Sequence, residues 1–151
     1  MLRTRLSDAL KAAMKAKDEL SVSTLRLILA ALKDRDIAAR SKGNKDGIPE
    51  SELLGLLQSM IKQRRDSIAA YESGGRMDLA QQEAGEIAII ESFMPEQMGD
   101  DEMADAIDAV IAGVGATGLK DMGKAMGALK AQYAGKMDFG KASALVKARL
   151  S

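Results

Sequence analysis

Cysteine and histidine are both absent from the 151-residue sequence. Without cysteine the chain has no disulfide and no thiolate, which agrees with a reducing compartment. Without histidine it lacks the commonest general base and the commonest metal ligand. No Ser–His or Cys–His pair is available to activate a nucleophile, and the carboxylates show no metal-ligand spacing. We therefore expect no catalytic residue, no cofactor and no metal site.

Long apolar runs and aromatic residues are scarce. No run approaches the roughly eighteen apolar residues that a membrane span needs. The N-terminal segment, MLRTRLSDALKAAMKAK, is interrupted by charges every few residues and has no signal-peptide core. We therefore expect a cytoplasmic protein with no membrane partner. Two Phe, two Tyr and no Trp also argue against stacking platforms for single-stranded nucleic acid.

Apolar residues recur at helical spacing along most of the chain, and strand signals are nearly absent, which predicts an all-α protein. The length allows one good core or two small ones. We expect an N-terminal four-helix domain over residues 1–96 and a three-helix domain over residues 97–151. The linker between them is expected near Pro95–Gly99.

Local signals predict the helix boundaries of the N-terminal half. Ser21 or Ser23 is expected to cap a second helix that runs through Ile37. The polar, glycine-containing segment 39–48 is expected to be a mobile surface loop. Pro49 then suits the first turn of the third helix.

The third and fourth helices are predicted to form a hairpin. Gly74-Gly75 is a C-terminal stop signal, and Asp78 with Gln81 suggests a capping box that opens the next helix. That helix is expected to end before Pro95. In the C-terminal half, Gly99 and Asp138 are expected to cap the fifth and seventh helices. The segments Gly113–Gly118 and Lys120–Gln132 are expected to be a loop and the sixth helix.

Two charges interrupt the apolar stripes of the predicted hairpin. Arg64 falls in the stripe of one helix and Glu83 in that of the other, with Glu86 opposite Arg64 in an antiparallel arrangement. Because an unpaired buried charge is costly, we expect an Arg64–Glu83/Glu86 cluster that fixes the register of the hairpin. In the alternative, Arg64 extends along the stripe and places its guanidinium in water.

Two glycine-rich segments imitate nucleotide-binding motifs. Gly113–Gly118 matches the G-x-G-x-x-G pattern, and Gly118–Ala125 resembles a P-loop whose final Ser/Thr is replaced by Ala125. Both mechanisms require a strand before the loop. No strand is predicted here, so we expect no nucleotide cofactor.

The zero net charge conceals three blocks. Residues 1–65 carry 14 basic and 8 acidic side chains, residues 66–108 carry 1 and 12, and residues 109–151 carry 7 and 2. A clustered basic surface is typical of phosphate binding, although the blocks could instead face one another or keep the helices soluble. The candidate nucleic-acid-binding residues are the seven C-terminal cations, Lys120, Lys124, Lys130, Lys136, Lys141, Lys147 and Arg149.

Gly123 and Gly127 lie one turn apart in the sixth predicted helix. Such glycines weaken a helix, by about 1 kcal/mol each against alanine. Their lack of side chains could also let another helix, or a nucleic-acid backbone, approach closely. Between a helix and a nucleic-acid backbone, we expect that another helix packs closely against these glycines.

Six segments together resemble the YqeY family, whose C-terminal part is similar to the tail domain of the B subunit of aspartyl/glutamyl-tRNA amidotransferase. Residues 40–50 diverge from the family pattern. The resemblance implies two helical domains, the second similar to a module that grips tRNA while catalysis lies elsewhere. The segments are LSDALKAAMKAKD (6–18), STLRLILAALKD (23–34), IKQRRDSI (61–68), GRMDLAQQEAGEI (75–87), FMPEQM (93–98) and KDMGKAMGALKAQYAGKMD (120–138).

These observations lead to one functional hypothesis and two alternatives. The leading hypothesis is a non-catalytic accessory protein that binds tRNA or a tRNA-processing enzyme through Lys120, Lys124 and Lys130. The first alternative is a protein–protein adaptor whose acidic middle segment docks a basic partner. The second, implied by the resemblance, is an auxiliary component of glutamine-dependent transamidation, a carbon–nitrogen ligase activity with glutamine as amido donor.

Overall fold

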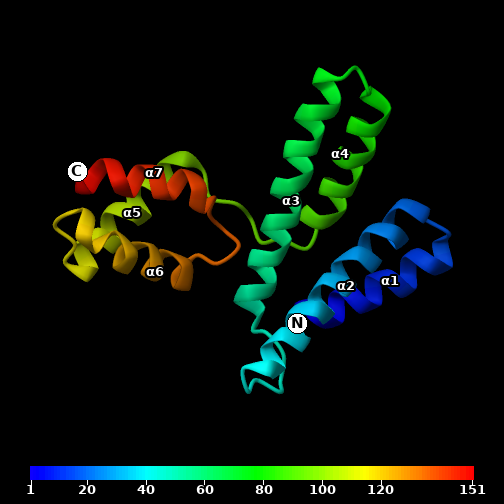
Figure 1. Cartoon of the computed structure of the whole chain (residues 1–151), viewed down its shortest axis with the longest axis horizontal. Coiled ribbons are helices and arrows are strands. Elements are labelled where there is room, and N and C mark those ends of the chain that lie inside the picture. The colour runs from blue at the N-terminus through cyan, green and yellow to red at the C-terminus, as the bar shows by residue number, and fades with distance from the viewer. The chain divides into compact units, whose positions relative to one another are not determined.

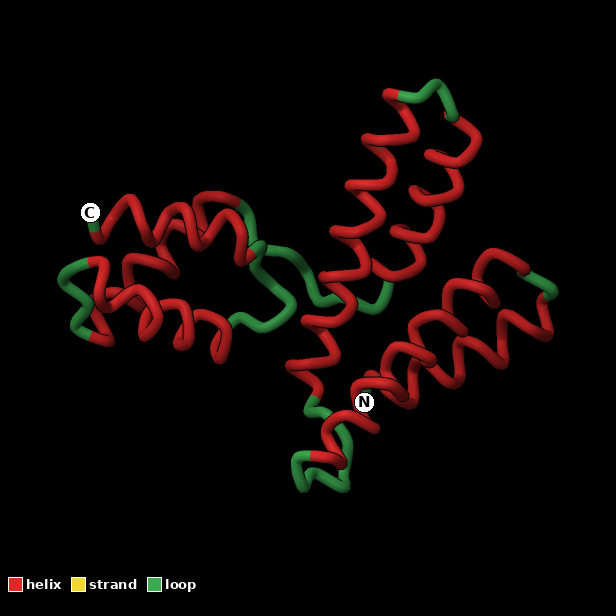
Figure 2. Tube along the Cα trace, in the orientation of Figure 1, coloured by secondary structure: helices red, strands yellow, loops and turns green.

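The computed structural model describes residues 1–151 and contains seven α-helices, one short 3-10 helix and no strand (Figures 1 and 2). The prediction of an all-α protein is therefore confirmed. Contacts divide the chain into two compact units, Met1–Met94 and Pro95–Ser151, which we call unit 1 and unit 2. This division falls two residues before the boundary expected from the sequence.

Unit 1 consists of two helical hairpins, visible in Figure 1 as α1–α2 and α3–α4. Helix α2 packs against α1 and also contacts α3 and α4. The side chains of Leu6, Ile28, Leu53, Leu57 and Ile90 are completely buried where the hairpins meet. The helices of unit 1 are α1 (Leu2–Ala16), α2 (Glu19–Ser41), α3 (Glu50–Ser73) and α4 (Met77–Glu91).

The first hairpin turns two residues after α1 ends. Lys17 adopts the left-handed conformation (φ 56°) that terminates α1. Asp18 then caps α2 by accepting hydrogen bonds from the backbone N–H of Ser21 (3.2 Å) and from its hydroxyl (2.6 Å). The prediction that Ser21 or Ser23 is the N-cap was wrong. The helix begins at Glu19, so both serines lie inside it, and the Asp18 carboxylate accepts a hydrogen bond from the backbone N–H of Ser21.

Helix α2 runs to Ser41, four residues beyond the predicted end. The loop that follows is shorter than predicted and its far end is anchored. Ile48 is buried, and its backbone N–H donates to Asp36 Oδ1 (2.9 Å) while its carbonyl accepts from Arg3 Nη2 (2.8 Å). The burial of Ile48 and these two hydrogen bonds thus fix the end of a segment whose composition predicted a mobile surface loop.

The second hairpin turns at Gly74-Gly75 as predicted, with Gly75 at φ 75°. Helix α4 begins at Met77 with Arg76 as its N-cap residue. The predicted capping box is therefore wrong, because the left-handed Gly75 lets the helix start before Asp78. Asp78 lies inside the first turn and pairs with Arg76 (3.2 Å), a position where the helix dipole favours a carboxylate.

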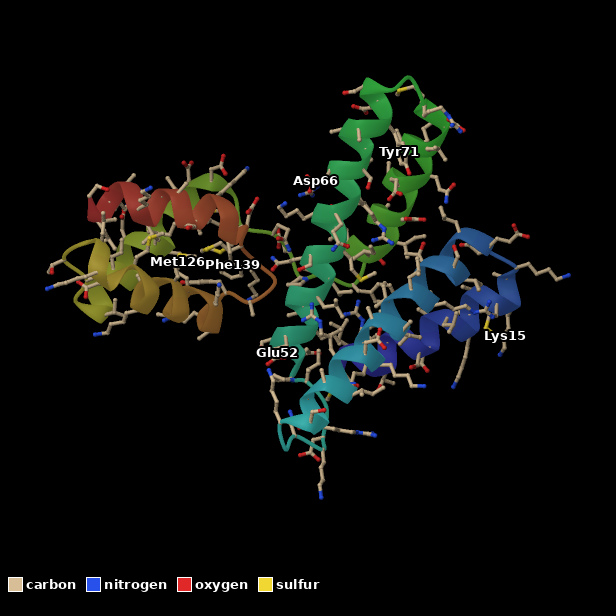
Figure 3. All side chains as sticks on the ribbon, in the orientation of Figure 1. Lys15, Glu52, Asp66, Tyr71, Met126 and Phe139 are labelled. Atoms are coloured by element: carbon tan, nitrogen blue, oxygen red, sulfur yellow. The ribbon has the colours of Figure 1, made fainter.

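Unit 2 is a bundle in which each of its three α-helices packs against the other two. Its elements are α5 (Asp100–Val114), a 3-10 turn (Leu119–Asp121), α6 (Met122–Gln132) and α7 (Phe139–Leu150). Ile107, Leu129 and Val146 are completely buried in its core. Met126 of α6 and Phe139 of α7, both labelled in Figure 3, are partly buried against this core.

Two predicted caps of unit 2 are confirmed. Gly99 is the N-cap residue of α5. Asp138 caps α7 by accepting hydrogen bonds from the backbone N–H groups of Gly140 (2.9 Å) and Lys141 (3.2 Å). The sixth helix differs slightly, because Lys120 lies in the 3-10 turn that precedes α6.

Candidate functional site

The six C-terminal lysines are all exposed, and none of them takes part in an ion pair. Their ammonium groups are therefore free to meet an anionic partner. They come from the 3-10 turn and α6 (Lys120, Lys124, Lys130), the connection to α7 (Lys136) and α7 itself (Lys141, Lys147).

Arg149 is different from the six lysines. Its Nε donates to Asp108 Oδ1, which ties the end of α7 to α5. Arg149 is one of the candidate nucleic-acid-binding residues, but the packing of α7 on α5 brings it together with Asp108, which lies 41 positions away in the sequence. Arg149 is therefore better described as a structural residue of unit 2.

The outward side of α6 contains two residues without side chains. Gly123 and Gly127 are both exposed, and a Cβ atom added to either would meet nothing within 4 Å. The expected close packing by another helix was therefore wrong. At 100° per residue the two glycines lie between Lys124 on one side and Lys130 on the other. We call this surface, with Lys120 at its N-terminal end, the α6 strip.

The segment before α6 is held in place by a side chain. Thr117 donates its backbone N–H to Asp121 Oδ2 (3.0 Å), and this hydrogen bond is the main reason why the pKa of Asp121 lies below its usual value. Lys120, next to Asp121, adds a smaller electrostatic contribution in the same direction. The turn that carries Lys120 is therefore braced against the loop.

The glycine-rich segment itself has none of the geometry of a phosphate loop. Helix α5 continues through Val114, and Gly115 ends it in the left-handed conformation (φ 69°). A helix rather than a strand thus leads into the loop, which removes the sheet edge that both nucleotide-binding motifs require.

Charge in unit 2 is separated by helix. Helix α5 carries five acidic and no basic side chains, whereas the six free lysines lie on or beside α6 and α7. Because all three helices pack on one another, the outward sides of α6 and α7 turn in different directions. The structure thus groups Lys120, Lys124 and Lys130 on the α6 strip, whereas Lys141 and Lys147 belong to α7 and do not share one face of that helix.

In unit 1, Arg64 lies beside both glutamates that the sequence placed opposite it. Its Nε is 2.9 Å from Glu86 Oε2 and 3.9 Å from Glu83 Oε2, and its Nη1 donates to the carbonyl of Met60 (3.2 Å). The Arg64 side chain is only 12% exposed. Burial, followed by the nearby Glu86 charge, raises the pKa of Glu83. The cluster joins α3 to α4.

Half of the acidic middle block is neutralised within the chain. Six of the twelve acidic residues in 66–108 form ion pairs, which removes them from any continuous acidic docking surface. Four of the other six lie together on the first turns of α5. The paired residues are Asp66, Asp78, Glu83, Glu86, Glu91 and Asp108, and the α5 group is Asp100, Asp101, Glu102 and Asp105.

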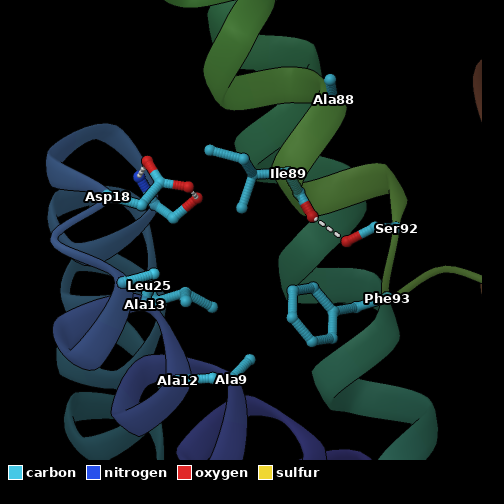
Figure 4. A pocket seen from close by; sticks show the side chains of 11 residues that line it. Ala9, Ala12, Ala13, Asp18, Leu25, Ala88, Ile89, Ser92 and Phe93 are labelled. Atoms are coloured by element: carbon cyan, nitrogen blue, oxygen red, sulfur yellow. Dashed lines mark hydrogen bonds between the residues drawn. The ribbon is translucent and has the colours of Figure 1, made fainter.

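Unit 1 also contains an open apolar groove of about 550 Å³ that the sequence reasoning missed (Figure 4). Alanines of α1 form one wall, and Ile89 of α4 and Phe93, which follows α4, form the other. The guanidinium carbon of Arg5 lies over the Phe93 ring, 5.5 Å from the ring centroid. The signal was present as small residues at helical spacing in α1, namely Ala9, Ala12, Ala13 and Ala16.

No group of three or more metal-ligating side chains gathers anywhere in the chain. None of the helices has the length and apolar character needed to span a bilayer.

Comparison with known proteins gives a family match over almost the whole chain. The family model described as "Yqey-like protein" matches residues 3–150. Similar proteins named "Altered inheritance of mitochondria protein 41, mitochondrial" occur in yeasts. The one from Kluyveromyces lactis is 38% identical over 88 residues, which is 58% of this chain and 45% of the relative. The one from Vanderwaltozyma polyspora is 36% identical over 89 residues, or 59% and 46%.

A relative of the same name from Saccharomyces cerevisiae is 36% identical over 91 residues, covering 60% of this chain and 47% of the relative. The chain thus spans about half the length of the curated relatives it matches. Their names state a mitochondrial location, which contradicts the expectation of a cytoplasmic protein. On the strength of the match over residues 3–150, the chain belongs to the YqeY family.

Proposed function

We propose that unit 2 binds the sugar–phosphate backbone of a folded RNA through the α6 strip. The observation that carries this proposal is the pair of open glycines, Gly123 and Gly127, with the free lysines Lys124 and Lys130 on either side. Lys120 extends the same surface. We propose tRNA as the RNA to test first, because the resemblance noted in the sequence implies a tail similar to that of the tRNA-dependent amidotransferase.

The physical basis is close approach combined with charge. A helix face without side chains lets a nucleic-acid backbone come near the helix, and the flanking ammonium groups then reach phosphates on both sides. The chain has few aromatic residues for base stacking. Recognition is therefore by the shape and backbone of a folded RNA.

The proposed role is that of an accessory protein. Unit 1 (Met1–Met94) and unit 2 (Pro95–Ser151) act as separate domains, close to the expected domains 1–96 and 97–151, and the second makes the RNA contact. If the chain assists transamidation, adding it to a glutamine-dependent amidotransferase reaction accelerates the conversion of Asp-tRNA or Glu-tRNA. The chain alone is expected to leave the aminoacyl-tRNA unchanged.

The test is titration of total tRNA with the full chain at two salt concentrations. We expect the wild type to shift tRNA at micromolar concentration and low salt. Lys120→Gln, Lys124→Gln and Lys130→Gln together are expected to weaken binding at least tenfold and to flatten the log–log salt dependence by about 2–3 units, because each of the three lost phosphate contacts removes about 0.7–0.9.

The matched control carries Lys11→Gln, Lys15→Gln and Lys45→Gln, three exposed lysines of unit 1 that form no ion pair. It loses the same charge but leaves the α6 strip intact, so its tRNA affinity should stay within about threefold of the wild type. Absence of a shift by the wild-type chain at low salt would remove direct RNA binding.

A second candidate is the protein–protein adaptor, now restricted to α5. Its support is the group of four unpaired carboxylates at the start of that helix, Asp100, Asp101, Glu102 and Asp105. Retrieval of the same basic partner from cell extract before and after nuclease treatment favours this candidate. A partner that disappears on nuclease treatment favours the RNA-binding role.

A further inference from the structure

The outward side of α2 carries a row of three cations. Arg26, Lys33 and Arg40 are seven residues apart, so they lie on one side of the helix and span about 21 Å. All three are exposed and none forms an ion pair. Arg40 contributes to the low pKa of Asp36, but that carboxylate is bound directly by Arg3.

An apolar strip runs beside this row. Ala30 and Ile37 are also seven residues apart, and Leu27 lies next to them around the helix. Ile37 and Leu27 are 50% and 51% exposed, on a helix whose opposite side supplies the core. Asp34, exposed and without an ion pair, is seven residues after Leu27 and shares its row, on the side of Ala30 and Ile37 that is away from the cations.

Helix α2 presents this surface rigidly. Its inner side is fixed by the buried Leu25, Ile28 and Leu32. Its C-terminal part is fixed by Asp36, which binds Arg3 of α1 and the backbone of Ile48. A surface that is already ordered loses little conformational entropy when a partner binds.

We propose that this side of α2 docks an acidic amphipathic helix of another protein. The charge order specifies the partner. Its acidic residues face Arg26, Lys33 and Arg40, its apolar residues cover Ala30 and Ile37, and a basic residue meets Asp34. Contacts at seven-residue intervals are the pattern by which two helices lie side by side.

Two other anionic partners fit this surface less well. A nucleic-acid backbone offers nothing to the half-exposed Leu27 and Ile37, and its phosphates are repelled by Asp34. A membrane-surface helix buries a wide apolar face, often with aromatic residues. The exposed side of α2 has neither feature, because Leu25, Ile28 and Leu32 of the helix are buried in the core.

The test uses the full chain and a synthetic 21-residue helical peptide. The peptide has Leu on its contact side, Glu at seven-residue intervals to face the cations, and Lys to face Asp34. We expect the wild type to bind it, by fluorescence anisotropy, at least tenfold more tightly than a scrambled peptide of the same composition. Arg26→Glu, Lys33→Glu and Arg40→Glu together should weaken binding at least tenfold and transfer the preference to a peptide with Lys in place of Glu.

The control variant carries Lys11→Glu, Lys15→Glu and Lys45→Glu, which change the net charge equally and should leave peptide affinity within about twofold. Ile37→Ser is a second variant that removes only an exposed apolar contact, and it should weaken binding several-fold without loss of helix content. The proposal is overturned if the peptide binds no better than its scrambled form or if the triple reversal has no effect. It is also overturned if the reversal mainly abolishes binding to tRNA or to phosphatidylserine vesicles.

Discussion

Asp36 is a single residue that joins three segments of unit 1. Arg3 donates to both of its carboxylate oxygens (2.7 and 2.8 Å), and the backbone N–H of Ile48 donates to one of them (2.9 Å). The hydrogen bonds from Arg3 are the largest reason why the pKa of Asp36 falls to about 2. The charged form is thus favoured by folding.

Asp36→Asn is expected to lower the free energy of unfolding by about 1–2 kcal/mol at pH 7, after allowance for the partial exposure of Arg3. Because the folded-state pKa is depressed, this contribution is present above about pH 4 and is lost as the pH falls towards 2. Urea unfolding between pH 7 and pH 2.5 should show the difference between wild type and variant shrinking in acid. Asp34→Asn, at an exposed and unpaired neighbour, should change little.

Arg64 is the residue on which the α3–α4 contact is expected to depend most. Replacing it with Met keeps much of its apolar stem but leaves the largely buried Glu86 without its partner. The free energy of unfolding should fall by about 3–5 kcal/mol. A loss below about 1 kcal/mol in chemical denaturation would mean that the cluster does not stabilise the hairpin.

Glu83 belongs to the same cluster as Arg64, and its contribution to stability depends on pH in the opposite direction to that of Asp36. Burial is the main cause of its raised pKa, and the neighbouring Glu86 adds to it. A raised folded-state pKa means that protonated Glu83 favours folding, and this contribution is lost as the pH rises above about 4.5. Glu83→Gln should therefore gain stability relative to the wild type between pH 4 and pH 7, measured by thermal unfolding. A constant difference across that range would contradict the assignment.

At the scale of the element, the glycines of α6 are expected to lower the stability of the helix and to leave its outward face open to an RNA backbone. Alanine at Gly123 and Gly127 meets no neighbouring atom, so each substitution should raise the free energy of unfolding by up to about 1 kcal/mol. The added methyl groups would also hold an RNA backbone away from the helix, so tRNA binding should weaken while stability increases.

Gly113→Ala is the matched control for this pair of substitutions. Gly113 lies in α5, and a Cβ atom there also meets nothing within 4 Å. The control should give the same gain in helix stability with unchanged tRNA binding. If the α6 variants bind tRNA as well as the wild type does, the glycines serve no close approach.

At the scale of the whole molecule, two cores of unequal size share one chain. The core of unit 1 draws on four helices, whereas unit 2 buries its apolar residues within three short ones. Small cores give marginal stability. In amide hydrogen exchange of the full chain, we therefore expect α5–α7 to open at a lower free energy than α2 and α3.

Leu57 of unit 1 and Val146 of unit 2, both completely buried, provide the controls for this prediction. Leu57→Ala should reduce protection in unit 1 alone, and Val146→Ala in unit 2 alone. Equal loss of protection in both units after either substitution would show that they unfold as one.

The helices of this protein follow from local properties of the sequence. Apolar residues repeat at helical spacing, Asp138 offers a carboxylate where the seventh helix starts, and Gly75 supplies the left-handed turn of the second hairpin. Such signals act over three or four residues and do not depend on the rest of the fold. For Arg64 too, helix geometry and the position of the turn were enough to place Glu86 opposite it.

Only the tertiary structure decided which of these features are available to a partner. Arg149 is bound by Asp108 of another helix, Gly123 and Gly127 face open space, and Ile48 anchors a loop that its composition leaves free. Each outcome depends on how helices distant in sequence pack against one another, because packing determines which side of a helix is covered and which charges meet.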